Sequence, residues 1–174
     1  MKVILCMVIS ANGIIAGENN EEDFISHDSW QAWLEILRQY GCVIWGRKTH
    51  QVVKTWPKSY FDDIKGIKVV VISANPDYEV SAGFELASSP EAALKTLKKQ
   101  GFKSVVLTGG ATLNTAFAKL GLIDEVILNV EPIIEGKGIP LFKPEVFELK
   151  LELIEMKKSK GKTIQLHYKV VKTR

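Results

Sequence analysis

Apolar residues along the chain fall into two kinds of pattern. Short apolar runs rich in β-branched residues are typical of buried strands, and they occur at 2–9, 42–45, 67–72 and 104–107, with a weaker one near 84–87. Apolar positions at helical spacing lie between them, at about 28–40, 90–100 and 111–120, and a short helix opens at Gly46. Strands that alternate with helices predict a single α/β domain over 1–174, in which a mixed, mainly parallel sheet carries helices on both faces.

The end of the chain has a different pattern. A strand at 125–130 is followed by a loop with glycines and by two further strands, 147–156 and 163–171, joined by a polar turn. This order predicts an antiparallel hairpin at one edge of the sheet. The side chains of the last strand that we expect to face solvent are Thr163, Gln165, His167 and Lys169, which alternate with apolar ones.

Two adjacent glycines, Gly109 and Gly110, stand where the strand at 104–107 gives way to a helix. The first N–H groups of a helix are unpaired and carry the positive end of its dipole, so a phosphate can bind there if no side chain blocks its approach. Glycines at such a junction either make only a tight turn or admit an anion to the backbone. This stretch alone leaves both interpretations open.

A second junction of the same kind follows the strand at 42–45. There Gly46 precedes Arg47, Lys48 and Thr49 at a helix start. These residues are either solvated or bind an anion, and anion binding is favoured because cations are unfavourable at a positive helix end without one. Two such sites on two strands suit a dinucleotide with an additional 2′-phosphate.

Composition narrows the classes of function. With 46% hydrophobic and 25% charged residues, the chain is typical of soluble globular proteins, and it has neither a long apolar segment nor a leader cleavage site, so we expect a cytoplasmic protein away from membranes. Cys6 and Cys42 lie in predicted strands without metal-ligand spacing, which favours core packing. The net charge of +3 comes from dispersed lysines, which argues against nucleic-acid binding and suits an anionic cofactor.

Several longer segments, taken in order, resemble one family. They are "ISANGIIAGEN", "WGRKTHQ", "VVVIS", "LTGGATLNTAF" and "GLIDEVILNVEPIIEGKGIPLF", followed by the closing hairpin. Together they resemble the dihydrofolate reductase superfamily, and within it the reductase (C-terminal) domain of the bifunctional riboflavin-biosynthesis deaminase-reductases. The resemblance implies a three-layer dihydrofolate-reductase-like fold and a homodimer. It also implies an NADPH-dependent reductase, of the 5-amino-6-(5-phosphoribosylamino)uracil reductase type, acting on a pyrimidine- or pteridine-like heterocycle. The alternatives are dihydrofolate reduction and a dinucleotide-binding module without turnover.

The resemblance also implies which residues bind the cofactor and which bind the substrate. For NADPH these are Val8, Ile15, Ala16, Gly46, Arg47, Lys48, Thr49, Ser73, Gly109, Gly110, Ala111, Thr112 and Leu113. Asn12, Asp28 and Trp30 are the expected substrate-binding residues.

Asp28 is the candidate catalytic residue for substrate anchoring and proton management, because folate reductases place a carboxylate near this point. The competing interpretation of Asp28 is a cap or dipole partner at a helix start. Two departures from the family weaken the substrate assignment. Asn12 replaces an aspartate that is often found in the family, and the segment "VVKTWPKSYFDDIKGIK" lacks the arginine-containing motif that grips the ribose phosphate.

Overall fold

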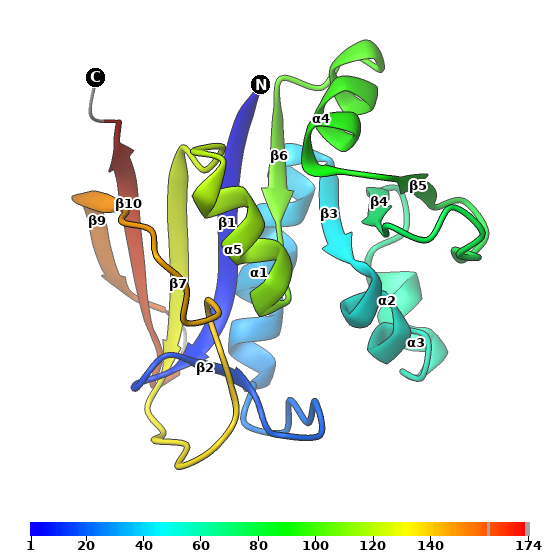
Figure 1. Cartoon of the computed structure of the whole chain (residues 1–174). Helices are drawn as coiled ribbons and strands as arrows, with labels where there is room; N and C mark the ends of the chain where they lie inside the picture. Colours follow the sequence, from blue (N-terminus) through cyan, green and yellow to red (C-terminus); the bar gives the residue numbers. More distant parts are fainter. Residues whose placement is uncertain (160, 173–174) are drawn as a thin grey trace.

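A computed structural model describes residues 1–159 and 161–172. Its main sheet has eight strands among these residues, in the order β5–β4–β3–β6–β1–β7–β10–β9 (Figure 1). The strands are β1 (Lys2–Ser10), β3 (Cys42–Gly46), β4 (Lys68–Ile72), β5 (Glu85–Ala87), β6 (Ser104–Leu107), β7 (Glu125–Glu131), β9 (Lys150–Lys158) and β10 (Ile164–Val171). Neighbours from β5 to β7 pair in parallel, and β10 pairs antiparallel with both β7 and β9. The predicted mixed sheet with a closing hairpin is confirmed.

Helices cover both faces of this sheet. The helices are α1 (His27–Tyr40), α2 (Arg47–Val53), α3 (Lys58–Asp63), α4 (Pro90–Lys99) and α5 (Ala111–Lys119). On one face, Leu34 and Leu37 of α1 belong to a buried cluster with Cys6 of β1. On the other face, Leu97 of α4 and Phe117 of α5 join a second cluster. Figure 1 shows α5 in front of the sheet and α1 behind it. The result is the expected three-layer arrangement, with both cysteines buried as small apolar residues.

Three short elements are absent from the prediction. Strands β2 (Ile14–Ala16) and β8 (Ile139–Pro140) form a separate two-stranded sheet, and α3 follows Pro57. Elements of two to six residues contain too little periodicity to be recognised from the sequence. Both β2 and α3 nevertheless border the cavity described below.

The prediction for the solvent face of the last strand is confirmed for Lys169, which is exposed, but it is wrong for the start of the strand. Thr163 and Gln165 are 1% and 6% exposed, whereas Ile164 is 45% exposed. Gln165 lies opposite Asn129 of β7, and its Nε2 donates to Asn129 Oδ1 at 2.8 Å. This face of the sheet lies on the side of α1, so polar side chains are enclosed there. On the other face of β10, Val170 is buried in the second core cluster, whereas Ile164 at the start of the strand is exposed.

No helix among the described residues is long and apolar enough to cross a membrane.

Candidate active site

The carboxyl ends of β1, β3 and β6 open into a cavity of about 330 Å³. In parallel sheets this is the edge where ligands bind, because the following loops and helix N-termini converge there. The cavity is lined by Met7, Val8, Ile15, Glu22, Asp23, Ile25, Trp30, Trp33, Trp45, Thr49, Val53, Trp56, Pro57, Tyr60 and Thr108. All four tryptophans of the chain are in this set.

Aromatic side chains form one wall of the cavity. The ring of Trp30 lies 4.8 Å from that of Trp33 and 5.0 Å from that of Tyr60, measured between centroids. Trp30 Nε1 donates to Asp63 Oδ2 at 2.9 Å, and Trp33 Nε1 donates to Thr108 Oγ1 at 3.1 Å. Because the polar atoms of both indoles are occupied, their apolar surfaces remain for a ligand. Such a wall suits a flat ring.

Beside this cavity the two glycine junctions meet in space. Gly46 N donates to Gly109 O at 2.9 Å, so the N-termini of α2 and α5 lie side by side. The N-cap residues, Gly46 and Gly110, offer no capping side chain to the helix N–H groups. A Cβ atom on Gly110 would lie 3.6 Å from Oγ1 of Thr49, which lines the cavity. The cradle of backbone N–H groups is therefore continuous with the cavity.

The two glycines of the pair have different roles. Gly109 has a φ of +53°, a left-handed conformation that favours glycine. Gly110 has a φ of −75°, which other residues adopt readily, so its missing side chain matters for space rather than for backbone conformation. Only Gly109 is therefore required by the turn itself.

Charged residues flank the cradle on the side of α2. Arg47 and Lys48 are exposed, and within the described part of the chain neither forms an ion pair with a carboxylate. Ser73 directly follows Ile72, the β4 residue paired with Gly46, so it lies at the same edge of the sheet. These groups form a positive margin next to two helix N-termini.

His50 holds the loop that follows β4 against α2. Its ring is fully buried, with Nδ1 2.7 Å from the Tyr78 hydroxyl and Nε2 2.9 Å from the Ser81 hydroxyl. The Ser81 N–H also donates to Nε2, so Nδ1 carries the proton of the neutral ring. Burial, together with the nearby Lys54, lowers the pKa of His50. Sequence reasoning missed this role, which depends on residues about 30 positions away.

The family model of the RibD C-terminal domain matches residues 1–165 of the chain. The protein belongs to this family. Its relative YwjB of Bacillus subtilis (strain 168), an uncharacterized protein, is 30% identical over 171 residues that cover 96% of this chain and 97% of YwjB.

Two solved structures show the same fold at lower identity. RibD of Acinetobacter baumannii superposes with a TM-score of 0.79 and 21% identity, over 98% of this chain and 58% of RibD. A dihydrofolate reductase of Enterococcus faecalis, complexed with NADP(H), superposes with a TM-score of 0.72 and 15% identity, over 97% and 96% of the two chains. The RibD C-terminal domain described here is thus dihydrofolate-reductase-like in fold.

The residues predicted to bind ligands divide into two groups in this RibD-type domain. Val8, Ile15, Trp30 and Thr49 line the cavity. The segment Gly109, Gly110, Ala111, Thr112 and Leu113 forms the cradle and the first turn of α5. Ala16 is buried in β2 behind the cavity wall, next to the backbone of Gly138.

Asp28 and Asn12 lie elsewhere than expected. Asp28 does not line the cavity, because its carboxylate lies against Gly161 in the turn between β9 and β10. Asn12 uses its side chain to hold the loop after β7, with Nδ2 donating to Glu135 O at 2.7 Å and Oδ1 accepting from Glu135 N at 3.1 Å. Their assignment to the substrate site therefore has no support from their positions.

Glu22 and Asp23 both bring carboxyl groups to the cavity lining, and sequence reasoning missed them. Asp23 is exposed, so Glu22 is the candidate. It lies on the loop between β2 and α1, it is half-buried, and burial raises the pKa of its side chain from 4.5 to about 7. A run of acidic residues at 21–23 was the only signal in the sequence, and such runs are usually solvated.

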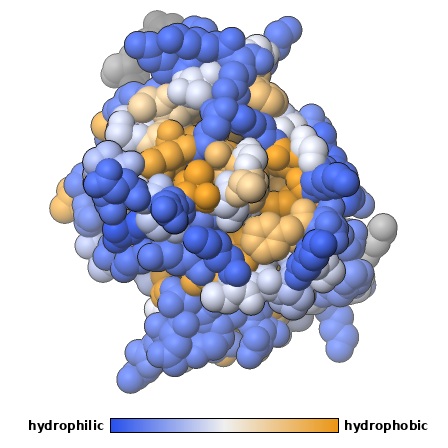
Figure 2. Space-filling model, turned by 90° about the vertical axis from the view of Figure 1, so that its right-hand side faces the viewer, coloured by the Kyte–Doolittle hydropathy of each residue, from blue (hydrophilic) through white to orange (hydrophobic). Residues whose placement is uncertain are grey.

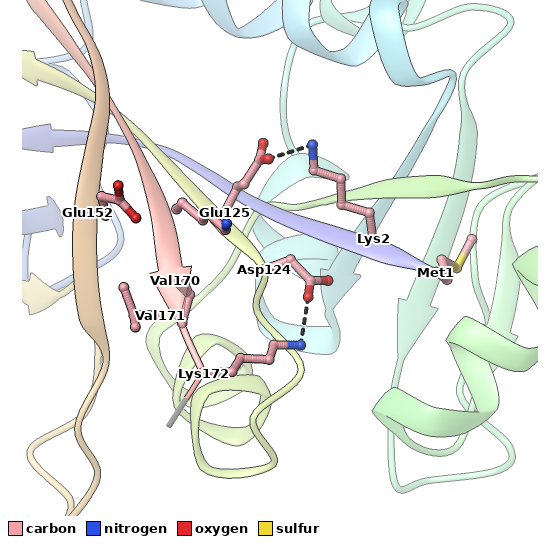
Figure 3. Close-up of a pocket in the computed structure, with 9 residues that line it drawn as sticks. Met1, Lys2, Asp124, Glu125, Glu152, Val170, Val171 and Lys172 are labelled. Atoms are coloured by element: carbon pink, nitrogen blue, oxygen red, sulfur yellow. Dashed lines mark hydrogen bonds and ion pairs between the residues drawn. The ribbon is translucent and has the colours of Figure 1, made fainter. Parts of the chain in front are cut away.

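A larger, open depression of about 680 Å³ lies at the opposite end of the sheet (Figure 3). Four of the six charged side chains that line it form ion pairs: Lys2 with Glu125 at 2.5 Å, and Lys172 with Asp124 at 2.6 Å. Asp124 also accepts from Val3 N at 2.8 Å. None of the described residues that line this depression is a glycine or an aromatic residue, so we place the candidate site in the first cavity.

Proposed function

We propose that this protein is an NADPH-dependent reductase that transfers hydride to a substrate containing a planar nitrogen heterocycle of the pyrimidine or pteridine kind. The observation that carries the proposal is the continuity between the tryptophan-lined cavity and the uncapped N-termini of α2 and α5, which share Thr49. One compartment suits a flat ring, and the other suits phosphates.

The residues present fit NADPH. The free backbone N–H groups that follow Gly46 and Gly110, at the starts of α2 and α5, would hold the pyrophosphate. Arg47 and Lys48 would bind the 2′-phosphate, with Ser73 toward the adenosine. Bound NADPH supplies a hydride from its nicotinamide. Support comes from the structurally similar dihydrofolate reductase, which was solved with NADP(H).

For the substrate we propose a ring of the 5-amino-6-(5-phosphoribosylamino)uracil type, in keeping with membership of the RibD family. Dihydrofolate is the second candidate, because a dihydrofolate reductase superposes over 97% of the chain. Of the described residues that line the cavity, none is a lysine, arginine or histidine. The cavity therefore suits the ring itself, and a ribose phosphate would have to extend beyond it.

Tryptophan fluorescence offers a direct test, since all four tryptophans line the cavity. Titration with NADPH should quench the emission, and NADPH should bind more tightly than NADH by about tenfold or more, because charge-assisted hydrogen bonds contribute about 1.5–3 kcal/mol. Arg47→Ala should reduce this preference; an unchanged ratio would remove Arg47 from the site. NADPH oxidation is then followed with each of the two substrates. Binding of NADPH without oxidation by either would favour a module without turnover.

We also propose that the protein is a homodimer. Leu151, Leu153 and Met156 of the edge strand β9 are 43%, 54% and 65% exposed, and they lie opposite Val170, Tyr168 and Leu166 of β10. This apolar strip continues the core face that α5 covers farther along the sheet, and Figure 1 shows no helix over β9 and β10. An uncovered apolar face on an unpaired edge strand supports this proposal, because such faces favour association with another chain.

A reducing, cytoplasmic location accompanies the proposal, because Cys6 and Cys42 are both unpaired.

A further inference from the structure

Glu22 is held in the cavity by the backbone around it. Gly17 N donates to Glu21 O at 2.8 Å, and Ile25 N donates to Glu22 O at 3.0 Å, so the loop closes on both sides of this residue. The loop ends at Ser26, whose N–H and hydroxyl both donate to Glu131 Oε1, at 2.9 and 2.6 Å. The fold therefore fixes the backbone that carries Glu22 at the cavity.

The carboxyl itself has no partner among the described residues. The cavity offers it indole rings, aliphatic side chains and two threonine hydroxyls. The other titratable side chains in the lining are Asp23 on the same loop and Tyr60 on α3, and β1, β2, α1, β3 and α2 contribute none. A half-buried carboxyl among apolar groups is costly to ionise, and a ligand with nitrogen atoms at its edge can satisfy it.

Figure 2 views the molecule from the side of β5 and α3, where apolar side chains gather at the centre and hydrophilic ones surround them. On this side of the molecule α3 contributes Tyr60, which is 39% exposed, to the cavity wall. The same cavity therefore offers a planar ligand both apolar surface and the Glu22 residue.

We propose that Glu22, rather than Asp28, binds the nitrogen edge of the substrate ring and supplies the proton that accompanies the hydride. This inference rests on the proposed reductase function. When a C=N bond is reduced, hydride adds to the carbon, the π electron pair moves to the nitrogen, and the nitrogen takes the proton from the Glu22 carboxyl. The carboxylate is then reprotonated from solvent. Protonated Glu22 is also available near neutral pH, because burial keeps its pKa at about 7.

The first test measures binding alone, with 2,4-diaminopyrimidine as the probe. Its amino groups and ring nitrogen are complementary to a carboxyl, and its binding is followed by tryptophan fluorescence from pH 5 to 9. Glu22→Gln should weaken the binding of the probe by about tenfold or more and should make this binding less dependent on pH. NADPH affinity should stay unchanged. Glu18→Gln, on the same loop but outside the cavity, is the matched control.

The second test measures single-turnover hydride transfer in the parent, Glu22→Gln and Asp28→Asn. Loss of the proton donor should slow this step by about a hundredfold or more in the Glu22 variant, and the parent's decline in rate as pH rises through about 7 should disappear. Three outcomes would overturn the assignment. The parent and Glu22→Gln could bind the probe equally well, the parent could fail to bind the probe, or Asp28→Asn rather than Glu22→Gln could lose the hydride-transfer rate. Failure of the parent to bind NADPH would refute the reductase function separately, whatever the probe shows.

Discussion

The buried position of Glu22 makes a prediction about stability that needs no ligand. Its pKa is about 7 in the folded protein, against an ordinary value of 4.5, so the folded state binds this proton more tightly than the unfolded state does. The neutral carboxyl therefore makes its whole contribution to the free energy of unfolding below pH 4.5. This contribution is lost as the pH rises from 4.5 to about 7. Glu22→Gln replaces the acid by a neutral amide of the same shape and removes this loss.

The size of the effect follows from the shift. The difference between 4.5 and about 7 is about 2.5 pKa units, and each unit corresponds to about 1.4 kcal/mol, which gives about 3.5 kcal/mol. The side chain is only half-buried, so solvent screening makes this figure an upper bound. We therefore expect Glu22→Gln to be more stable than the parent at pH 8.5, by about 1–3 kcal/mol, and nearly equal to it at pH 4.5.

Urea denaturation followed by circular dichroism at both pH values measures this difference. Glu18→Gln serves as the control for removing one negative charge from the same loop, and it should change stability little at either pH. If Glu22→Gln showed the same difference from the parent at pH 4.5 and pH 8.5, the carboxyl would not be desolvated in the folded protein. The physical basis for its role in the cavity would then be lost.

Two further predictions concern the cradle and the edge strand. Gly110→Val should leave a folded protein, since the nearest atom to a new Cβ is 3.6 Å away, but it should weaken NADPH binding by more than about tenfold because the side chain blocks the helix N-terminus. Gly136→Val, in an open loop, is the control. Normal NADPH binding by the Gly110 variant would show that the glycine only makes a turn. Leu153→Asp should convert the dimer to a monomer in light scattering, whereas Val146→Asp, at a residue that is 98% exposed, should not; a monomeric parent would refute the dimer.

The sequence by itself determined the regular elements and the cradle. The runs that became β1, β3 and β6, and the helical spacing that became α1 and α5, bury their own apolar faces, so periodicity alone located them to within a few residues. The junction at Gly109 and Gly110 could also be predicted from the local sequence, because two consecutive glycines at a strand-to-helix turn can be recognised without the tertiary structure.

Only the tertiary structure decided which side chains are enclosed. Gln165 is buried on the face of the sheet that carries α1, where it donates to Asn129 of β7, although the alternation along β10 marked this face as solvent-facing. His50 is enclosed by Tyr78 and Ser81 from a loop about 30 residues later in the chain.

The choice between Asp28 and Glu22 has the same origin. Asp28 lies against Gly161 of the distant hairpin turn, and the loop that carries Glu22 is fastened through Ser26 to Glu131, 105 residues further along the chain. Contacts between segments far apart in sequence determine where a loop carboxyl lies and how far it is shielded from solvent. The local pattern could therefore place acidic residues near the site, but only the packed structure could decide which of them enters it.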